Sequence, residues 1–90
     1  MKILLNELNV YEIEKLHKKI LKEIQLVQTS FTLNFTKVEQ IDLIGIQLLL
    51  SLKKYCDENK IKLKFSNINA RQVKQTFKMF NLNQTLDITS

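Results

Sequence analysis

The sequence predicts an α/β domain in which a small mixed β-sheet of four to five strands carries about three to four helices, packed mainly on one face. Two segments alternate apolar and polar residues as half-buried strands do: FTLNFT at residues 31–36 and IKLKF at residues 61–65. Two others, at about residues 11–27 and 70–80, repeat apolar residues at the spacing of an amphipathic helix. Because helices and strands alternate along the chain, the pattern favours an α/β fold.

The chain of 90 residues is long enough for one domain, which we expect to cover residues 1–90. Hydrophobic residues make up 44% and charged residues 26%, which is ordinary for a soluble globular protein. The apolar runs are too short to cross a bilayer, so we expect no insertion into a membrane. The first residues, MKILLNELNVYE, reach acidic side chains too early for a signal peptide, and we expect a cytoplasmic protein.

The two alternating strands should be apolar on one face only, because a strand buried on both faces is apolar throughout. Since a helix separates them, they should also pair in parallel. A further short strand is expected from KILL, residues 2–5, continued by LNV after a polar turn at Asn6 and Glu7. Lys62 and Lys64 should face solvent, whereas the opposite face should be buried beneath the helices through Phe31, Leu33, Phe35, Ile61, Leu63 and Phe65.

The stretch VEQIDLIGIQLLLSL, residues 38–52, carries a further helix of about fifteen residues. Asp42 is suited to cap its start, since a carboxylate accepts hydrogen bonds from the free N–H groups of the first turn. Ile41 and Ile46 occupy the positions of a hydrophobic staple. The leucines are too many for one narrow stripe, so we expect most to pack against the other helices and one or two near Gly45 to contact a partner or a second copy.

Gly45 is the only glycine in the chain, and it would be the third residue of this helix. Glycine inside a helix costs roughly 1 kcal/mol relative to alanine. What it provides is space, needed either by a neighbouring strand or helix or by a partner or ligand, and the sequence leaves both explanations open. A phosphate-binding loop is not indicated, because the glycine patterns of such loops are missing and Asp42 would repel an anion.

The predicted helix at residues 70–80 has an apolar stripe formed by Val73, Phe77 and Phe80. Its outer face carries Arg71, Lys74 and Lys78. Although the net charge is +5, the lysines are scattered along the chain, so we expect a solvated face and no nucleic-acid binding. The closing segment, residues 81–88, should pack back on the core through Leu82, Leu86 and Ile88.

No group of residues in the sequence predicts catalysis, metal binding or a cofactor. The candidate acids, bases and nucleophiles form no constellation: Glu39, Asp42, Asp57, Glu58, His17 and Cys56. The single cysteine cannot form an intrachain disulfide, and with the single histidine it cannot complete a structural zinc site. We therefore expect an inert, partly buried thiol, a solvated histidine and a protein that is not an enzyme.

The segment LNFTKVEQIDLIGIQLLLSLKKYCDENKIKLKF, residues 33–65, with SNINARQVKQTFKMFNLNQTLDI after it, resembles the STAS domain. This family is named after sulphate transporters and anti-sigma-factor antagonists. The shared features are a strand, an Asp-x-x-Gly loop, a long helix, a strand and a last helix. The segment LLNELNVYEIEKL, residues 4–16, is similar to the family's opening strands and first helix, so the resemblance covers nearly the whole chain.

The resemblance implies a stand-alone bacterial protein–protein interaction module. In members that act as switches the loop is Asp-Ser-Ser-Gly, and a partner kinase phosphorylates the first serine. Asp42 and Gly45 match this loop, whereas Leu43 and Ile44 replace the serines, so no phosphorylation is expected at the usual position. The implied partner is an anti-sigma or histidine-kinase-like regulator or, alternatively, the ATPase subunit of a phospholipid-trafficking ABC transporter; a homodimer stays open. Partner contacts are expected at Asp42, Leu43, Ile44, Gly45 and Gln47.

Overall fold

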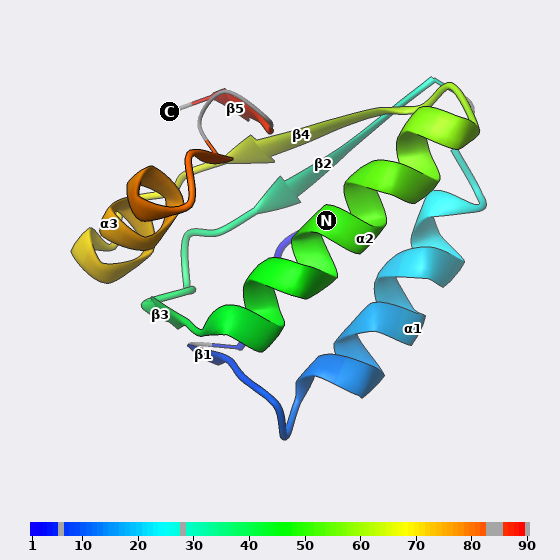
Figure 1. Ribbon diagram of the computed structural model, residues 1–90. Helices are drawn as coiled ribbons and strands as arrows, with labels where there is room; N and C mark the ends of the chain where they lie inside the picture. Colours follow the sequence, from blue (N-terminus) through cyan, green and yellow to red (C-terminus); the bar gives the residue numbers. More distant parts are fainter. Residues whose placement is uncertain (6, 28, 83–85, 90) are drawn as a thin grey trace.

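The computed structural model describes residues 1–5, 7–27, 29–82 and 86–89. Three helices and five short strands alternate along these residues (Figure 1). In chain order they are β1 (Glu7–Leu8), α1 (Ile13–Ile24), β2 (Ser30–Asn34), β3 (Gln40–Ile41), α2 (Leu43–Glu58), β4 (Lys62–Ser66), α3 (Arg71–Met79) and β5 (Asp87–Thr89). The predicted α/β fold class is confirmed.

The strands are divided between two sheets rather than joined in one. β2, β4 and β5 form a three-stranded sheet in that order, and β1 pairs with β3 in a second sheet of two strands. Each of these pairings is parallel, and so is the isolated bridge between Lys2 and Asn34. The expectation of one mixed sheet with four to five strands is therefore corrected. A helix lies between the members of each pair along the chain, which returns the second strand in the same direction as the first.

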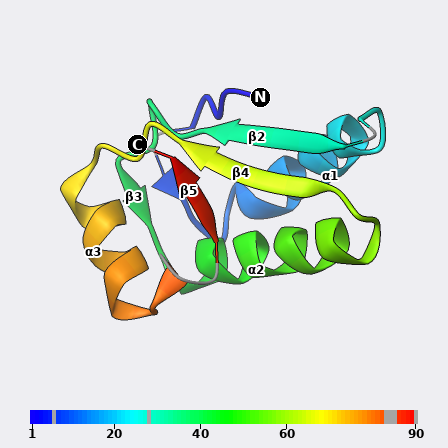
Figure 2. The same ribbon diagram turned by 90° about the horizontal axis from the view of Figure 1, so that it is seen from above.

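The alternation in β2 and β4 has the predicted consequence for burial. Phe31, Leu33, Phe35, Ile61, Leu63 and Phe65 are all buried. On the opposite face Lys62 is exposed, whereas Lys64 is half-buried rather than fully solvated. Figure 1 shows α1 and α2 side by side on one side of β2 and β4, and Figure 2 shows α3 beyond the end of these strands, next to β3. One face of the larger sheet thus carries the two long helices, as predicted.

Helix α1 is shorter than the predicted 11–27. The side chain of Asn9 accepts a hydrogen bond from the Tyr11 amide at 3.0 Å, and its carbonyl accepts from the amides of Glu12 and Ile13. These bonds hold the preceding residues in a turn, so regular helix begins only at Ile13. The buried stripe of α1 is Leu16, Ile20 and Ile24.

The C-terminal part of the chain corrects two expectations. Val73 and Phe77 of α3 are buried, but Phe80 is 45% exposed because the helix has ended there, with Phe80 as its C-cap. Leu82 and Leu86 are buried as predicted, and the side chain of Ile88 lies outside the described residues. The last residues form β5, a strand that the sequence did not predict, beside β4.

Among the described residues, three that are not glycine adopt the left-handed backbone region. Lys60, Asn67 and Asn81 have φ values of 58°, 57° and 58°. Lys60 follows the C-cap of α2 and Asn81 follows the C-cap of α3, which is where a left-handed residue ends a helix. The only glycine of the sequence, Gly45, lies inside α2 and not at one of these positions.

Candidate functional site

The first turn of α2 is capped by Asp42. This residue has an extended backbone, with φ −108° and ψ −176°, and its Oδ1 accepts a hydrogen bond from the Gly45 amide at 2.9 Å. Ile41 before the cap and Ile46 inside the helix are both buried, as the staple pattern requires. The predicted cap and the inward orientation of Ile41 are confirmed.

Replacing Asp42 with alanine should lower the free energy of unfolding by about 1 kcal/mol, because the Gly45 amide loses its acceptor. Urea unfolding followed by circular dichroism measures this difference. Asp42→Asn is the matched control, since asparagine is an equally good cap and should keep nearly all of the stability. Equal losses in the two variants would contradict a capping role for the carboxylate.

The space left by Gly45 is filled by the protein itself. A Cβ at this position would lie 2.6 Å from Cγ1 of Ile41, 2.7 Å from the carbonyl oxygen of Leu8 and 3.0 Å from Cβ of Leu8. Gly45 is buried, with β1 and β3 packed directly against it. Of the two explanations that the sequence left open, the structure supports the neighbouring strand. The expectation of a partner contact at Gly45 is corrected, because this residue is buried within the fold.

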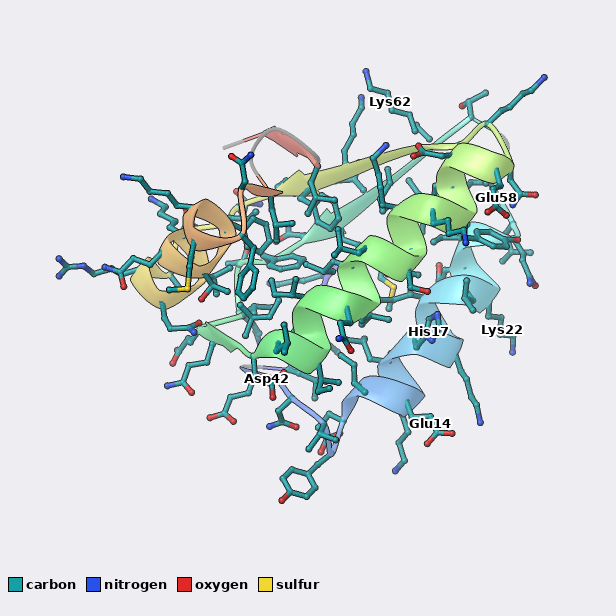
Figure 3. The ribbon with its side chains drawn as sticks, in the orientation of Figure 1. Glu14, His17, Lys22, Asp42, Glu58 and Lys62 are labelled. Atoms are coloured by element: carbon teal, nitrogen blue, oxygen red, sulfur yellow. The ribbon has the colours of Figure 1, made fainter. Side chains whose placement is uncertain are left out.

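The other four predicted contact residues are all exposed. Leu43 is 54% and Ile44 37% exposed, and Asp42 and Gln47 are also open to solvent. Most of the remaining apolar residues of α2 are buried, among them Leu48, Leu49 and Leu52. We call the surface formed by Asp42, Leu43, Ile44 and Gln47 the docking end of α2; Figure 3 shows Asp42 at its start.

Two hollows border the docking end. A recess of about 330 Å³ lies beside Asp42, between β1, β3 and the side chain of Gln72. A groove of about 320 Å³ separates α1 from α2 and is lined by Ile13, His17, Ile44 and Gln47, among others. His17, expected to be solvated, is half-buried in this groove. Gln72 of α3 and His17 of α1 could not be predicted at this place, because both belong to elements distant from Asp42 in the chain.

The remaining candidates for chemistry do not converge on the docking end. Cys56 is buried in α2, and its burial, followed by the charge of Asp57, raises the pKa of its thiol, while Lys53 acts in the opposite direction. The Asp57 carboxylate forms an ion pair with Lys53 on the surface of the helix, with 2.6 Å between Oδ1 and Nζ. In the described parts of the chain, no three residues among His, Cys, Asp and Glu are grouped so as to hold a metal ion.

The described fold is thus a small parallel α/β fold with two apolar side chains, Leu43 and Ile44, exposed at the start of α2. The family model described as STAS domain matches residues 4–90, and the chain belongs to this family. At the level of the family, it is a protein-interaction or regulatory module, and STAS domains are generally non-enzymatic. No curated protein matches the sequence. Within the described ranges, every helix is too short or too polar to cross a membrane.

Proposed function

We propose that this chain is a bacterial, cytoplasmic STAS subunit with a regulatory or scaffolding role, and that it binds its protein partner through the docking end of α2. The observation that carries the proposal is the exposure of Leu43 and Ile44 directly after the capping Asp42. Adjacent apolar side chains left in water at a rigid helix start favour burial against another protein surface.

The binding is not switched by phosphorylation at the usual place. The two positions at which switch members of the family carry serine hold Leu43 and Ile44, which have no hydroxyl group. Other hydroxyl groups belong to Ser51, which lines the groove between α1 and α2, and to Thr36 after β2. A phosphate found on either residue by mass spectrometry, together with loss of partner binding, would contradict an unswitched module.

Two kinds of partner fit this proposal. The first is a regulator of the anti-sigma or histidine-kinase type, as for an anti-sigma-factor antagonist. The alternative is the ATPase subunit of a phospholipid-trafficking ABC transporter, whose STAS subunit needs no phosphoserine. Leucine and isoleucine in the loop weaken the first without establishing the second. Identification of the protein that co-purifies from the native cell distinguishes the regulator from the ATPase subunit. Self-association of the purified chain at micromolar concentration would show that it also forms a homodimer.

Leu43→Glu should weaken the complex by roughly 2 kcal/mol or more if Leu43 lies at the centre of the interface, because the substitution buries a charge against apolar atoms. The tagged variant is compared with wild type in pull-downs from native lysate with quantitative mass spectrometry, after circular dichroism confirms folding. Gly45 variants are unsuitable for this test, since Gly45 is buried within the fold.

Leu26→Glu is the matched control for this experiment. Leu26 is also an exposed leucine, and it follows the C-terminal end of α1. That end of α1 is remote from the start of α2 (Figure 1). The control should retain every partner that wild type captures. If Leu43→Glu and Leu26→Glu retain the same proteins in the same amounts, the docking end is not the binding surface.

A further inference from the structure

The outer edge of β3 is closed by a side chain rather than by another strand. The Asp42 amide bonds to the carbonyl of Leu8 at 3.2 Å, so the amide and carbonyl of the preceding residue, Ile41, point away from β1. Both groups meet Gln72 of α3. Its Oε1 accepts from the Ile41 amide at 2.8 Å, and its Nε2 donates to the Ile41 carbonyl at 2.9 Å.

A second residue of α3 holds Gln72 in place. The Gln72 Nε2 also donates to Oγ1 of Thr76 at 3.1 Å, and the Thr76 hydroxyl donates to the backbone carbonyl of Gln72 at 2.8 Å. The amide orientation is fixed, because the opposite orientation would set donor against donor and acceptor against acceptor at Ile41. Gln72 thus replaces one strand residue in the ladder.

We propose that Gln72, oriented by Thr76, is a positioning residue that fixes the start of α2. Ile41 lies immediately before the cap Asp42, and its side chain packs against Gly45 in the first turn. A shift of Ile41 therefore moves the cap and the residues after it. Through these two hydrogen bonds α3 determines where the docking end is held. The consequence for partner binding rests on the proposed function, whereas the positioning itself is a property of the free protein.

The test compares Gln72→Met with Gln75→Met by amide hydrogen exchange and NMR. Methionine keeps the length of glutamine and removes both bonds to Ile41. Gln75 is exposed on the same helix, and its side chain makes no hydrogen bond with the described residues, so it is the matched control. In Gln72→Met, exchange at Ile41 should accelerate about tenfold relative to the core amide of Phe35. The rate at Asp42 should also rise, and Gln75→Met should change neither.

A second pair of variants tests the donor and acceptor roles separately. In Gln72→Glu at neutral pH, the carboxylate can accept from the Ile41 amide but faces the Ile41 carbonyl with an oxygen. Once protonated, the carboxyl has a hydroxyl that can donate to that carbonyl. Gln72→Glu should therefore unfold at a lower urea concentration than Gln75→Glu at pH 7. This difference between the two midpoints should shrink as the pH falls toward about 4. Glu7 and Asp42 line the same recess and are present in both variants.

The outcomes separate this proposal from the docking proposal. An Ile41 exchange rate within about twofold of wild type in Gln72→Met, relative to Phe35, overturns the positioning role. If Gln72→Met does not fold, equal urea midpoints of Gln72→Glu and Gln75→Glu at pH 7 overturn it instead. Faster exchange at Ile41 together with unchanged partner capture by Leu43→Glu would end the docking proposal and leave the positioning role of Gln72 intact.

Discussion

Replacing Phe35 with alanine should lower the free energy of unfolding by about 3–5 kcal/mol, which is a large part of the stability of a domain this small. Phe35 is 1% exposed. Its ring meets Phe65 of β4 and Phe77 of α3 edge to face, with centroids 5.8 Å and 6.3 Å away. Truncation leaves a cavity between the sheet and α3 and removes both ring contacts. Urea unfolding followed by circular dichroism measures the loss.

Phe80→Ala is the matched control for the Phe35 variant, because Phe80 is half-exposed at the end of α3. It should cost about 1 kcal/mol or less. If Phe35→Ala is too unstable to measure, Phe35→Leu retains an apolar side chain and should fall between wild type and the alanine variant. Equal losses at positions 35 and 80 would show that the three rings are not the centre of the core.

Gly45→Ala should destabilise the protein, although alanine is the better helix former by about 1 kcal/mol. The added methyl group would be 2.7 Å from the Leu8 carbonyl oxygen, which is backbone and already bonded to the Asp42 amide. Overpacking of this kind costs about 1–3 kcal/mol, so after the gain in helix propensity the net loss should be up to about 2 kcal/mol. Gly45→Leu should lose considerably more, and thermal or urea unfolding checks the order of the two variants.

Ser51→Ala tests the helix-propensity part of this argument alone. Ser51 is exposed in the same helix, and its replacement by alanine adds no clash, so stability should rise by about 0.5 kcal/mol. A Gly45→Ala variant that gains stability in the same way would mean that β1 can move aside at little cost. The close packing of Leu8 on α2 would then not be the reason for the glycine.

Local patterns predicted most of the elements of this fold. Alternation in β2 and β4, helical spacing in α1 and α3, and the cap at Asp42 each depend on residues a few positions apart. The division into two sheets and the strand β5 were missed, because pairing between distant segments leaves no periodic mark in a single sequence. Phe80 was misplaced because the end of α3 depends on the left-handed Asn81, which a helical period does not reveal.

The candidate site was predicted in part for the same reason. The capping of α2 and the absence of hydroxyl groups at positions 43 and 44 follow from adjacent residues. The contact of Leu8 with Gly45 joins residues that are far apart in the chain. The two hydrogen bonds between Gln72 and Ile41 likewise join residues 31 positions apart. Only the folded chain shows why Gly45 is glycine and which side chain supports the residue before Asp42.

The left-handed residues Lys60, Asn67 and Asn81 have a consequence for the gene that encodes such a protein. Every glycine codon begins with two guanines, whereas lysine and asparagine codons begin with two adenines. Mutation toward a higher AT content therefore replaces glycine codons with lysine or asparagine codons. A turn tolerates this exchange at a cost of roughly 1–2 kcal/mol, and less for asparagine. Position 45 does not, because the obstacle there is the carbonyl of a neighbouring strand and not the backbone angle. Drift in base composition can therefore remove glycine from the turns of this fold but not from the first turn of α2.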